Sequence, residues 1–218
     1  MEIKKVGIVG AGQMGNGIAH VFALAGYDVV VNDISQEALD KAVATITRNL
    51  DRQVSREKIT AEKRDTALAR ITTTLQLEDL GQTDLVIEAA TEREDVKNAI
   101  FERLLPHLKP ETILTSNTSS ISITRLASRT DRPEKFMGFH FMNPVPVMQL
   151  VELIRGIATD EATYHTLLKV VENLGKTAAS AEDFPAFIVN RILMPMINEA
   201  VYTLYEGVGN VRSIDESL

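Results

Sequence analysis

The first segment of the chain, VGIVGAGQMGNGIAHVFALAGYDVVV, places an apolar run, three glycines, a helical pattern and a second apolar run in succession. Gly10, Gly12 and Gly15 have the spacing G-x-G-x-x-G. In a strand–turn–helix unit, the first glycine allows a tight turn, the second lets the backbone approach a pyrophosphate, and the third lets the helix pack closely on the strand. The helix then directs free N–H groups at the phosphates. This segment predicts a βαβ unit that binds a dinucleotide.

The second apolar run leads to Asp33, at the distance from Gly15 where a carboxylate accepts a hydrogen bond from the 2′-hydroxyl of a bound ribose. A phosphate on that hydroxyl would meet the negative charge, and the segment NDISQEALDK contains no arginine to offset it. NAD is therefore predicted over NADP. In the alternative, the glycines only close a turn and Asp33 only caps a helix, which leaves the combined spacing unexplained.

Short β-branched runs alternate with longer helical patterns through most of the chain. This alternation predicts an α/β fold with a Rossmann-type, doubly wound and mostly parallel sheet that helices cover on both faces. The predicted strands are Ile3–Val9, Asp28–Asn32, Ile71–Thr74, Leu85–Glu88, Ile113–Thr115, Lys135–Phe139, Gln149–Leu153 and Thr177–Ser180. The predicted helices are Gln13–Ala25, Gln36–Arg52, Ala61–Arg70, Arg93–Leu105, Ile123–Ala127 and Glu161–Leu174.

The pattern changes after Pro185. Phe187–Tyr205 is predicted as one long, apolar helix, which Pro195 kinks and which Gly207 and Gly209 end. A capping box is predicted at Ser213–Glu216, opening a further helix. We therefore expect residues 1–184 to form an NAD-binding domain and residues 185–218 to begin an all-helical C-terminal domain, cut off at the last residue.

Composition excludes several classes of protein. The chain of 218 residues has no cysteine, which excludes disulfides and thiolate sites, and its net charge of −7 argues against a general nucleic-acid binder. No apolar run reaches the about 18 residues of a membrane span, and MEIKKVGIVG lacks a signal-peptide layout. A cytoplasmic protein with no nucleic-acid or membrane partner is predicted. No His, Asp and Glu cluster has metal-ligand spacing, so no metal is predicted.

The segment GFHFMNPVPVMQLVEL contains two apolar runs on either side of a proline-containing turn. If the runs fold back about residue 146, His140 lies opposite Glu152. A carboxylate facing a histidine fixes the tautomer of the ring and stabilises its protonated form, as acid–base catalysis requires. The alternative is a histidine packed in the core and a glutamate on an edge strand. The spacing alone does not decide between the two.

Polar residues follow two of the predicted strands. Glu92 comes after LVIEAAT, and the run Thr115–Ser120 ends another strand. Because ligands of open α/β sheets bind outside the carboxyl ends of the strands, both segments are predicted to line the cleft. Loops of this composition more commonly form only turns and helix caps, so these residues alone favour that interpretation over a catalytic Ser119.

The segments GAGQMGNGIA, VIEAATE, SNTSS, HFMNPVPVMQLVEL and FPAFIVNRIL together resemble the L-3-hydroxyacyl-CoA dehydrogenases, in order along essentially the whole chain. The likeness is strongest to the short bacterial 3-hydroxybutyryl-CoA dehydrogenases. The resemblance implies that His140 is the catalytic base, with Glu152 as its partner. It implies that Ser119 hydrogen-bonds the reacting oxygen and that Asn190 helps to position the substrate. The residues implied to contact NAD are Gly10, Ala11, Gly12, Gln13, Met14, Gly15, Asp33, Glu92, Lys97, Ser119 and Asn143.

The family also binds coenzyme A through basic or polar residues on the long helix after the second strand. Arginines recur there at every fourth position, at Arg48, Arg52 and Arg56. The resemblance makes Arg52 and Arg56 the candidates for the coenzyme phosphates, with Lys58 as a further one. The alternative is a solvated helix face whose arginines pair with Asp51 and Glu57.

Two departures from the family are visible. Ala186 and Phe187 stand where the family often has Gly before an aromatic residue, so a slight change of turn geometry is expected. The helical domain of the family also continues for some tens of residues beyond the position that corresponds to Leu218 and forms much of a dimer interface. A homodimer is therefore expected when that domain is complete.

The predicted function is NAD-dependent interconversion of (S)-3-hydroxyacyl-CoA and 3-oxoacyl-CoA, with short chains such as 3-hydroxybutyryl-CoA and acetoacetyl-CoA, in fatty acid and butanoate metabolism. Two alternatives stand beside it. One is a related dehydrogenase of a free hydroxy acid such as L-gulonate. The other is an inactive NAD-binding fragment or structural protein, against which the joint presence of His140, Glu152, Ser119 and Asn190 argues.

Overall fold

A single eight-stranded sheet forms the centre of the protein. The computed structural model describes residues 2–218. The strand order is β3-β2-β1-β4-β5-β6-β7-β8, and every neighbouring pair is parallel except β6 and β7, which are antiparallel. The strands are β1 Lys5–Val9, β2 Asp28–Asn32, β3 Ile71–Thr74, β4 Leu85–Glu88, β5 Ile113–Ser116, β6 Phe136–Phe141, β7 Leu150–Arg155 and β8 Thr177–Glu182. The predicted fold class is confirmed.

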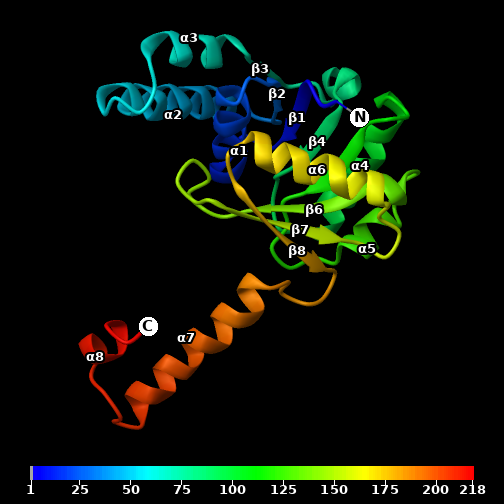
Figure 1. Ribbon diagram of the computed structural model, residues 1–218. Coiled ribbons are helices and arrows are strands. Elements are labelled where there is room, and N and C mark those ends of the chain that lie inside the picture. The colour runs from blue at the N-terminus through cyan, green and yellow to red at the C-terminus, as the bar shows by residue number, and fades with distance from the viewer. Residues whose placement is uncertain (1) are drawn as a thin grey trace.

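Helices cover both faces of this sheet (Figure 1). They are α1 Gln13–Leu24, α2 Gln36–Ser55, α3 Ala61–Ala69, α4 Glu94–Leu104, α5 Ile123–Ala127, α6 Glu161–Asn173, α7 Val189–Tyr205 and α8 Val211–Asp215, with short 3-10 helices η1 Leu77–Gln82, η2 Leu105–His107 and η3 Pro133–Lys135. The apolar residues of α1, α2, α3 and α6 share one core with the strands, and those of α4, α5 and η1 share the other.

Each core is organised around phenylalanines. On one face, Phe22 of α1 meets Phe139 of β6 edge to face, with ring centroids 6.3 Å apart. On the other face, Phe101 of α4 meets Phe136 at 5.2 Å. These side chains are fully buried, and their burial removes a large apolar area from water. Burial on both faces explains the continuous apolar runs of inner strands such as β2 and β4.

Several predicted element ends differ from the observed ones, by up to three residues, and two of these differences have a clear physical cause. The sequence places the end of a strand at Phe139, just before His140, but β6 continues to Phe141 because its last residues pair with β7. The predicted capping box at Ser213 is not the start of a helix, since α8 begins at Val211. The Asn210 side chain caps it by accepting a hydrogen bond from Ser213 N at 2.9 Å.

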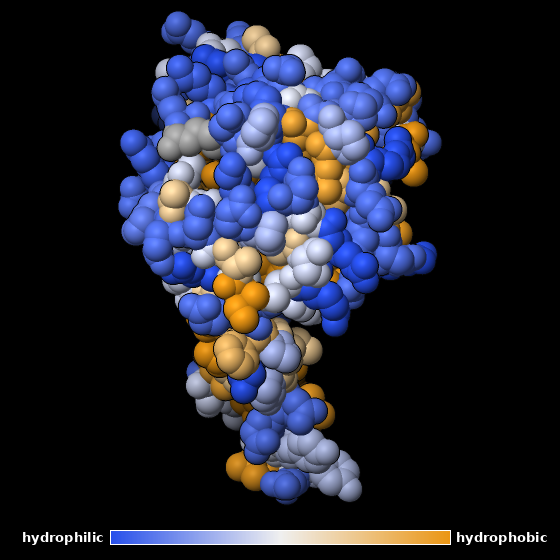
Figure 2. All heavy atoms as spheres, turned by 90° about the vertical axis from the view of Figure 1, so that its right-hand side faces the viewer, coloured by the Kyte–Doolittle hydropathy of each residue, from blue (hydrophilic) through white to orange (hydrophobic). Residues whose placement is uncertain are grey.

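The long helix α7 projects away from the sheet and its covering helices (Figure 1). Pro195 lies inside α7, and the helix continues on both sides of it. None of its residues is buried, although many are apolar, and Figure 2 shows hydrophobic side chains gathered on this extension. Within residues 2–218, no helix is long and apolar enough to cross a membrane.

Candidate active site

The glycine-rich turn between β1 and α1 has the shape that a pyrophosphate needs. Gly10 adopts a φ of +101°, and a Cβ there would lie 2.7 Å from the carbonyl oxygen of Ala89. A Cβ on Gly15 would lie 1.7 Å from the carbonyl oxygen of Gly10, which shows how closely α1 approaches the turn. Within residues 2–218, no atom outside the turn itself lies within 4 Å of such a Cβ at Gly12, and no side chain caps the N-terminus of α1. Open space in front of free N–H groups fits a dinucleotide phosphate.

Asp33 follows β2 at the same edge of the sheet. Its Oδ2 accepts a hydrogen bond from Ala11 N at 2.8 Å, and its Oδ1 accepts one from Ser35 N at 3.0 Å. The carboxylate therefore lies beside the glycine-rich turn, as the spacing predicts for the ribose of NAD. The next side chain, Ile34, is 94% exposed. Sequence reasoning missed it, although an isolated apolar residue within the polar segment NDISQ is a visible signal.

His140 and Glu152 face each other across the antiparallel pair of β6 and β7. They are direct partners in the strand register, which confirms the fold-back predicted around residue 146. His140 Nδ1 lies 2.7 Å from Glu152 Oε2, and both side chains are buried. Burial opposes the charged form of Glu152. The hydrogen bonds from His140 and from the backbone N–H groups of Val189 and Ile188 outweigh burial and hold the pKa of this carboxyl below its ordinary value.

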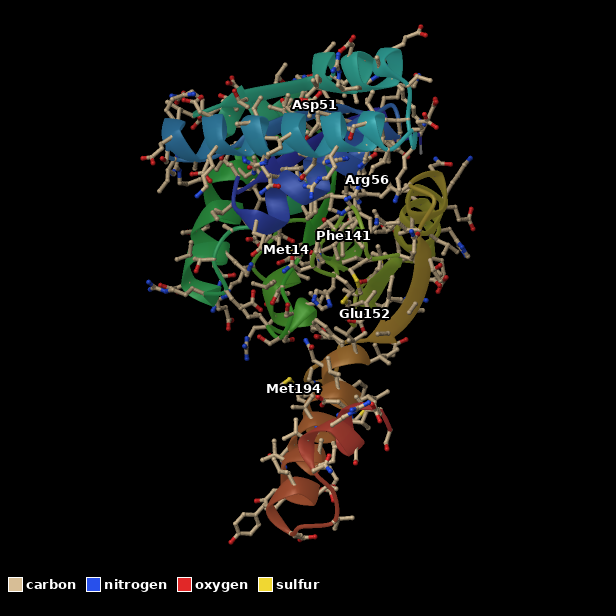
Figure 3. The ribbon with its side chains drawn as sticks, turned by 90° about the vertical axis from the view of Figure 1, so that its left-hand side faces the viewer. Met14, Asp51, Arg56, Phe141, Glu152 and Met194 are labelled. Carbon is tan, nitrogen blue, oxygen red and sulfur yellow. The ribbon has the colours of Figure 1, made fainter. Side chains whose placement is uncertain are left out.

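Ser119 lies on the opposite side of the imidazole. Its Oγ is 3.0 Å from His140 Nε2, so the ring is held between a carboxylate and a hydroxyl. Asn190, in the first turn of α7, donates from Nδ2 to the backbone oxygen of Ser119 at 3.4 Å. The four predicted catalytic residues thus come together, and Figure 3 shows Glu152 where the sheet domain meets α7.

Glu92 holds the loop that carries Ser119. Its Oε1 accepts hydrogen bonds from Thr118 Oγ1 at 2.6 Å, from Ser119 N at 2.9 Å, and from both the N–H and the hydroxyl of Ser120. Burial opposes its charge, but these donors and the nearby ammonium of Lys97 hold the pKa of Glu92 below its ordinary value. Glu92 therefore shapes the loop at the carboxyl ends of β4 and β5.

Lys97 lies beneath this loop and not on the open surface of the cleft. Its side chain is 1% exposed, and its Nζ donates to both oxygens of Glu88, at 2.9 and 2.7 Å. Glu88 also accepts a hydrogen bond from Ser116 Oγ at 2.6 Å. In this arrangement Lys97 supports Glu92, whose Oε2 is 3.6 Å away. The sequence analysis placed Glu88 at the end of a strand but gave it no role, because its partners Lys97 and Ser116 come from other elements.

Asn143 connects the His140 strand to the glycine-rich turn. Its Oδ1 accepts a hydrogen bond from Gln13 Nε2 at 3.1 Å. Lys176, which the sequence did not single out, holds the loop that follows, because its Nζ donates to the carbonyl oxygens of Val145 at 2.8 Å and Met148 at 2.7 Å. Burial lowers the pKa of the Lys176 ammonium.

A groove of about 710 Å³ lies between α1, the end of α2 and the loop after β6. Its cationic side chains are Arg52, Arg56, Lys58, Lys63 and Lys176, and we call it the cationic groove. The alternative interpretation, in which Arg52 forms an ion pair with Asp51, is wrong. Asp51 faces α3, where it accepts a hydrogen bond from Arg64 at 2.9 Å (Figure 3). Arg52 Nη2 instead donates to Asn49 Oδ1 at 2.5 Å, within the groove.

Comparison with known proteins agrees with this geometry. The profile described as "3-hydroxyacyl-CoA dehydrogenase, NAD binding domain" matches residues 5–184, and that described as "3-hydroxyacyl-CoA dehydrogenase, C-terminal domain" matches residues 187–218. A 3-hydroxybutyryl-CoA dehydrogenase of Bradyrhizobium diazoefficiens is 64% identical over 99% of this chain and 74% of its own length. A 3-hydroxyadipyl-CoA dehydrogenase of Escherichia coli is 42% identical over 100% of this chain and 46% of its own length.

Among solved structures, the (S)-3-hydroxybutyryl-CoA dehydrogenase of Ralstonia eutropha superposes with a TM-score of 0.94 and 48% identity, over 97% of this chain and 75% of that one. The fold therefore has counterparts in a family whose members share an NAD-binding domain. The chain belongs to the 3-hydroxyacyl-CoA dehydrogenase family of NAD-dependent enzymes.

Proposed function

We propose that this protein interconverts (S)-3-hydroxybutyryl-CoA and acetoacetyl-CoA, with His140 as the acid–base residue. The observation that carries the proposal is the imidazole of His140, held between Glu152 and Ser119 at the carboxyl edge of the sheet that also bears the glycine-rich turn. The names of the relatives from Bradyrhizobium diazoefficiens and Ralstonia eutropha support the short acyl chain, and the latter name supports the (S) configuration.

Proton transfer takes place at Nε2 of His140. In oxidation this nitrogen accepts the proton of the 3-hydroxyl, and Glu152, bonded to Nδ1, stabilises the imidazolium that forms. The glycine-rich turn and Asp33 would hold NAD, which would supply the acceptor for the hydride of carbon 3. In the opposite direction, protonated His140 donates from Nε2 to the carbonyl oxygen as negative charge develops there. The Ser119 hydroxyl and the Asn190 amide donate to the same oxygen and stabilise that charge.

The NAD site is formed by the predicted residues Gly10–Gly15, Asp33, Glu92, Lys97, Ser119 and Asn143. Of these, the turn and Asp33 bind phosphate and ribose. The exposed side chain of Ile34, next to Asp33, offers an apolar surface to the adenine. The ammonium of Lys97 is buried, so Lys97 does not contact NAD directly. It supports the NAD site by its ion pairs with Glu88 and Glu92.

The cationic groove binds the phosphates of coenzyme A, with Arg52 and Arg56 as the principal contacts. Guanidinium groups bind phosphate through two parallel hydrogen bonds, and the exposed ends of both arginines are available for this. We also propose a homodimer, for which the uncovered apolar residues of α7 are the support, and a location in the cytoplasm, as the sequence predicts.

The function is tested by mixing the protein with acetoacetyl-CoA and NADH and following the absorbance of NADH. We expect oxidation of NADH with the CoA ester and none with free acetoacetate, since only the ester carries phosphates for the cationic groove. Equal turnover of the free acid would favour the alternative of a hydroxy-acid dehydrogenase, and no turnover of either would contradict the proposal.

The role of His140 is tested by His140→Gln in the same assay. Turnover should fall about 10²–10⁴-fold, the range that a positioned acid–base group contributes. Binding of NADH, measured by fluorescence, should stay near that of the unchanged protein. His165→Gln is the matched control, because His165 lies exposed on α6. Unchanged turnover in His140→Gln would remove His140 from the mechanism.

A further inference from the structure

The two carboxylate oxygens of Glu152 accept hydrogen bonds from two different elements, the strand β6 and the start of α7. Oε2 faces His140 Nδ1 at 2.7 Å, within the sheet. Oε1 accepts hydrogen bonds from the backbone N–H groups of Ile188 at 3.0 Å and Val189 at 2.9 Å. These two residues form the N-terminus of α7, after the chain has left β8. The segment that leads into the helical domain therefore completes the surroundings of the buried carboxylate.

A tight turn presents those two N–H groups. Ala186 and Phe187 both have positive φ, of 67° and 52°, and Phe187 N donates to Phe184 O at 3.0 Å. The Phe187 side chain is 4% exposed, and its ring lies edge-on to the imidazole of His140, with centroids 6.0 Å apart. Any movement of this turn displaces both the amides on Glu152 and the ring beside His140.

Asp183 fixes the start of the turn. Its Oδ2 accepts hydrogen bonds from Ser122 Oγ at 2.7 Å and Thr124 N at 2.8 Å, and its Oδ1 accepts one from Ile123 N at 2.9 Å. Burial opposes the charge of Asp183, but these donors outweigh it and hold the pKa of the carboxyl below its ordinary value. The three donors begin α5, which directly follows the loop of Ser119. Asp183 therefore connects the turn that leads to α7 with the start of α5, two segments that lie on opposite sides of His140.

We infer that Asp183 is a positioning residue for the proton transfer, acting through residues 184–187 and the amides of Ile188 and Val189 on Glu152. The inference rests on the proposed function of His140. A buried carboxylate that loses two N–H donors attracts the proton of its partner more strongly, so those amides moderate the basicity of the imidazole. Within residues 2–218, the other hydrogen-bond partner of the His140 ring is the Ser119 hydroxyl, and its aromatic neighbour is the Phe187 ring; both groups are uncharged. Glu152 is thus the charged group through which Asp183 acts.

The inference is tested by following the imidazole ¹⁵N signals of the intact, cofactor-free protein through a pH titration. In Asp183→Ala we expect the pKa of His140 to rise by about 0.5 or more, because Glu152 is no longer held by both amides. The kcat for acetoacetyl-CoA reduction should fall about tenfold, with the KM for NADH unchanged. Asp183→Asn keeps the shape and one acceptor oxygen, and should show a smaller change in both quantities.

Asp160→Ala is the matched control. Asp160 caps α6 by accepting a hydrogen bond from Thr163 N at 2.7 Å, so this variant also loses an aspartate cap, but away from the turn. It should leave the His140 titration unchanged. If Asp183→Ala does not fold, Ser122→Ala removes one of the three hydrogen bonds and should shift the titration in the same direction.

A folded Asp183→Ala or Ser122→Ala protein with the His140 pKa and kcat of the unchanged protein would overturn the inference. A lowered His140 pKa in Asp183→Ala would also overturn it, as would a His140 shift in Asp160→Ala equal to that in Asp183→Ala. His140→Gln assigns the signal and separates the two proposals. If that variant keeps its turnover, the proposed function fails, whereas the titration still reports whether Asp183 acts on the imidazole.

Discussion

Glu152 remains charged in the interior because its oxygens face three donors: the imidazole of His140 and the two amides at the start of α7. The partnership with His140 was predictable, since a hairpin centred at residue 146 places the two side chains opposite each other. The amides were not, because they come from a turn 36 and 37 residues further along the chain. A pattern of neighbouring residues cannot predict contacts between residues 36 or 37 positions apart.

A second buried histidine has a consequence for stability. His20 on α1 is 1% exposed, its Nε2 lies 3.0 Å from Gln53 Nε2, and its Nδ1 has no hydrogen-bond partner within residues 2–218. Burial, and then the charge of Lys176, lower its pKa from 6.5 to about 4. Between pH 6.5 and about pH 4, His20 therefore binds a proton in the unfolded chain but not in the folded protein.

From this difference, we expect the free energy of unfolding to fall by about 3 kcal/mol between pH 7 and pH 4 on account of His20 alone. The fall levels off below pH 4, where the folded protein also becomes protonated. Urea unfolding of His20→Gln over this range should give a flatter dependence on pH than the unchanged protein. His165→Gln, at an exposed position, should keep the original slope. Equal slopes in all three proteins would contradict the assignment.

At the scale of elements, the predicted strands and helices are present, and their ends differ from the predicted ones by at most three residues. Strand ends follow pairing, as in β6, where contact with β7 extends the strand through His140 and Phe141. The start of α7 follows backbone conformation, because Ala186 and Phe187 are left-handed and cannot be part of a right-handed helix. In the local sequence, the one sign of this turn was Ala186, at a position where the related family often has glycine.

The left-handed conformation of Ala186 predicts that Ala186→Gly stabilises the protein. A Cβ in this region costs about 1–2 kcal/mol, of which the greater flexibility of glycine in the unfolded chain offsets a part. We expect a gain of about 0.5–1 kcal/mol in the free energy of unfolding, measured with urea. Ala44→Gly, on the exposed face of α2, is the control and should lose up to about 1 kcal/mol. A loss in both variants would show that position 186 is not strained.

At the scale of the whole molecule, the site depends on one edge of the sheet. The glycine-rich turn, Asp33, the Ser119 loop and His140 come from four different strands or strand ends, and parallel order brings their carboxyl ends together. The cationic groove requires a further contact, between the end of α2 and the loop after β6. The arginine spacing predicted a stripe on α2, but only packing showed that the stripe faces a groove.

We predict that charge reversal in the cationic groove weakens the use of CoA substrates. In Arg52→Glu with Arg56→Glu, the KM for acetoacetyl-CoA should rise about tenfold or more, because two phosphate contacts are replaced by repulsion. The kcat and the KM for NADH should change little. Arg48→Glu is the matched control, since Arg48 is exposed on the same helix but does not line the groove. An equal KM in all variants would show that coenzyme A binds elsewhere.

The sequence by itself determined the alternation of strands and helices and the dinucleotide motif, and it placed Glu152 opposite His140 on the condition that the chain folds back about residue 146. These features depend on local spacing: side chains repeat with the period of a helix or strand, and a short turn fixes the register of a hairpin. Only the tertiary structure decided that Lys97 is buried against Glu88, that Asp183 binds the start of α5, and that two amides of α7 hold Glu152. Those contacts join different elements, at separations of 9, 60 and 36 residues, and they form because buried charges must find hydrogen-bond partners once the sheet and its helices have packed.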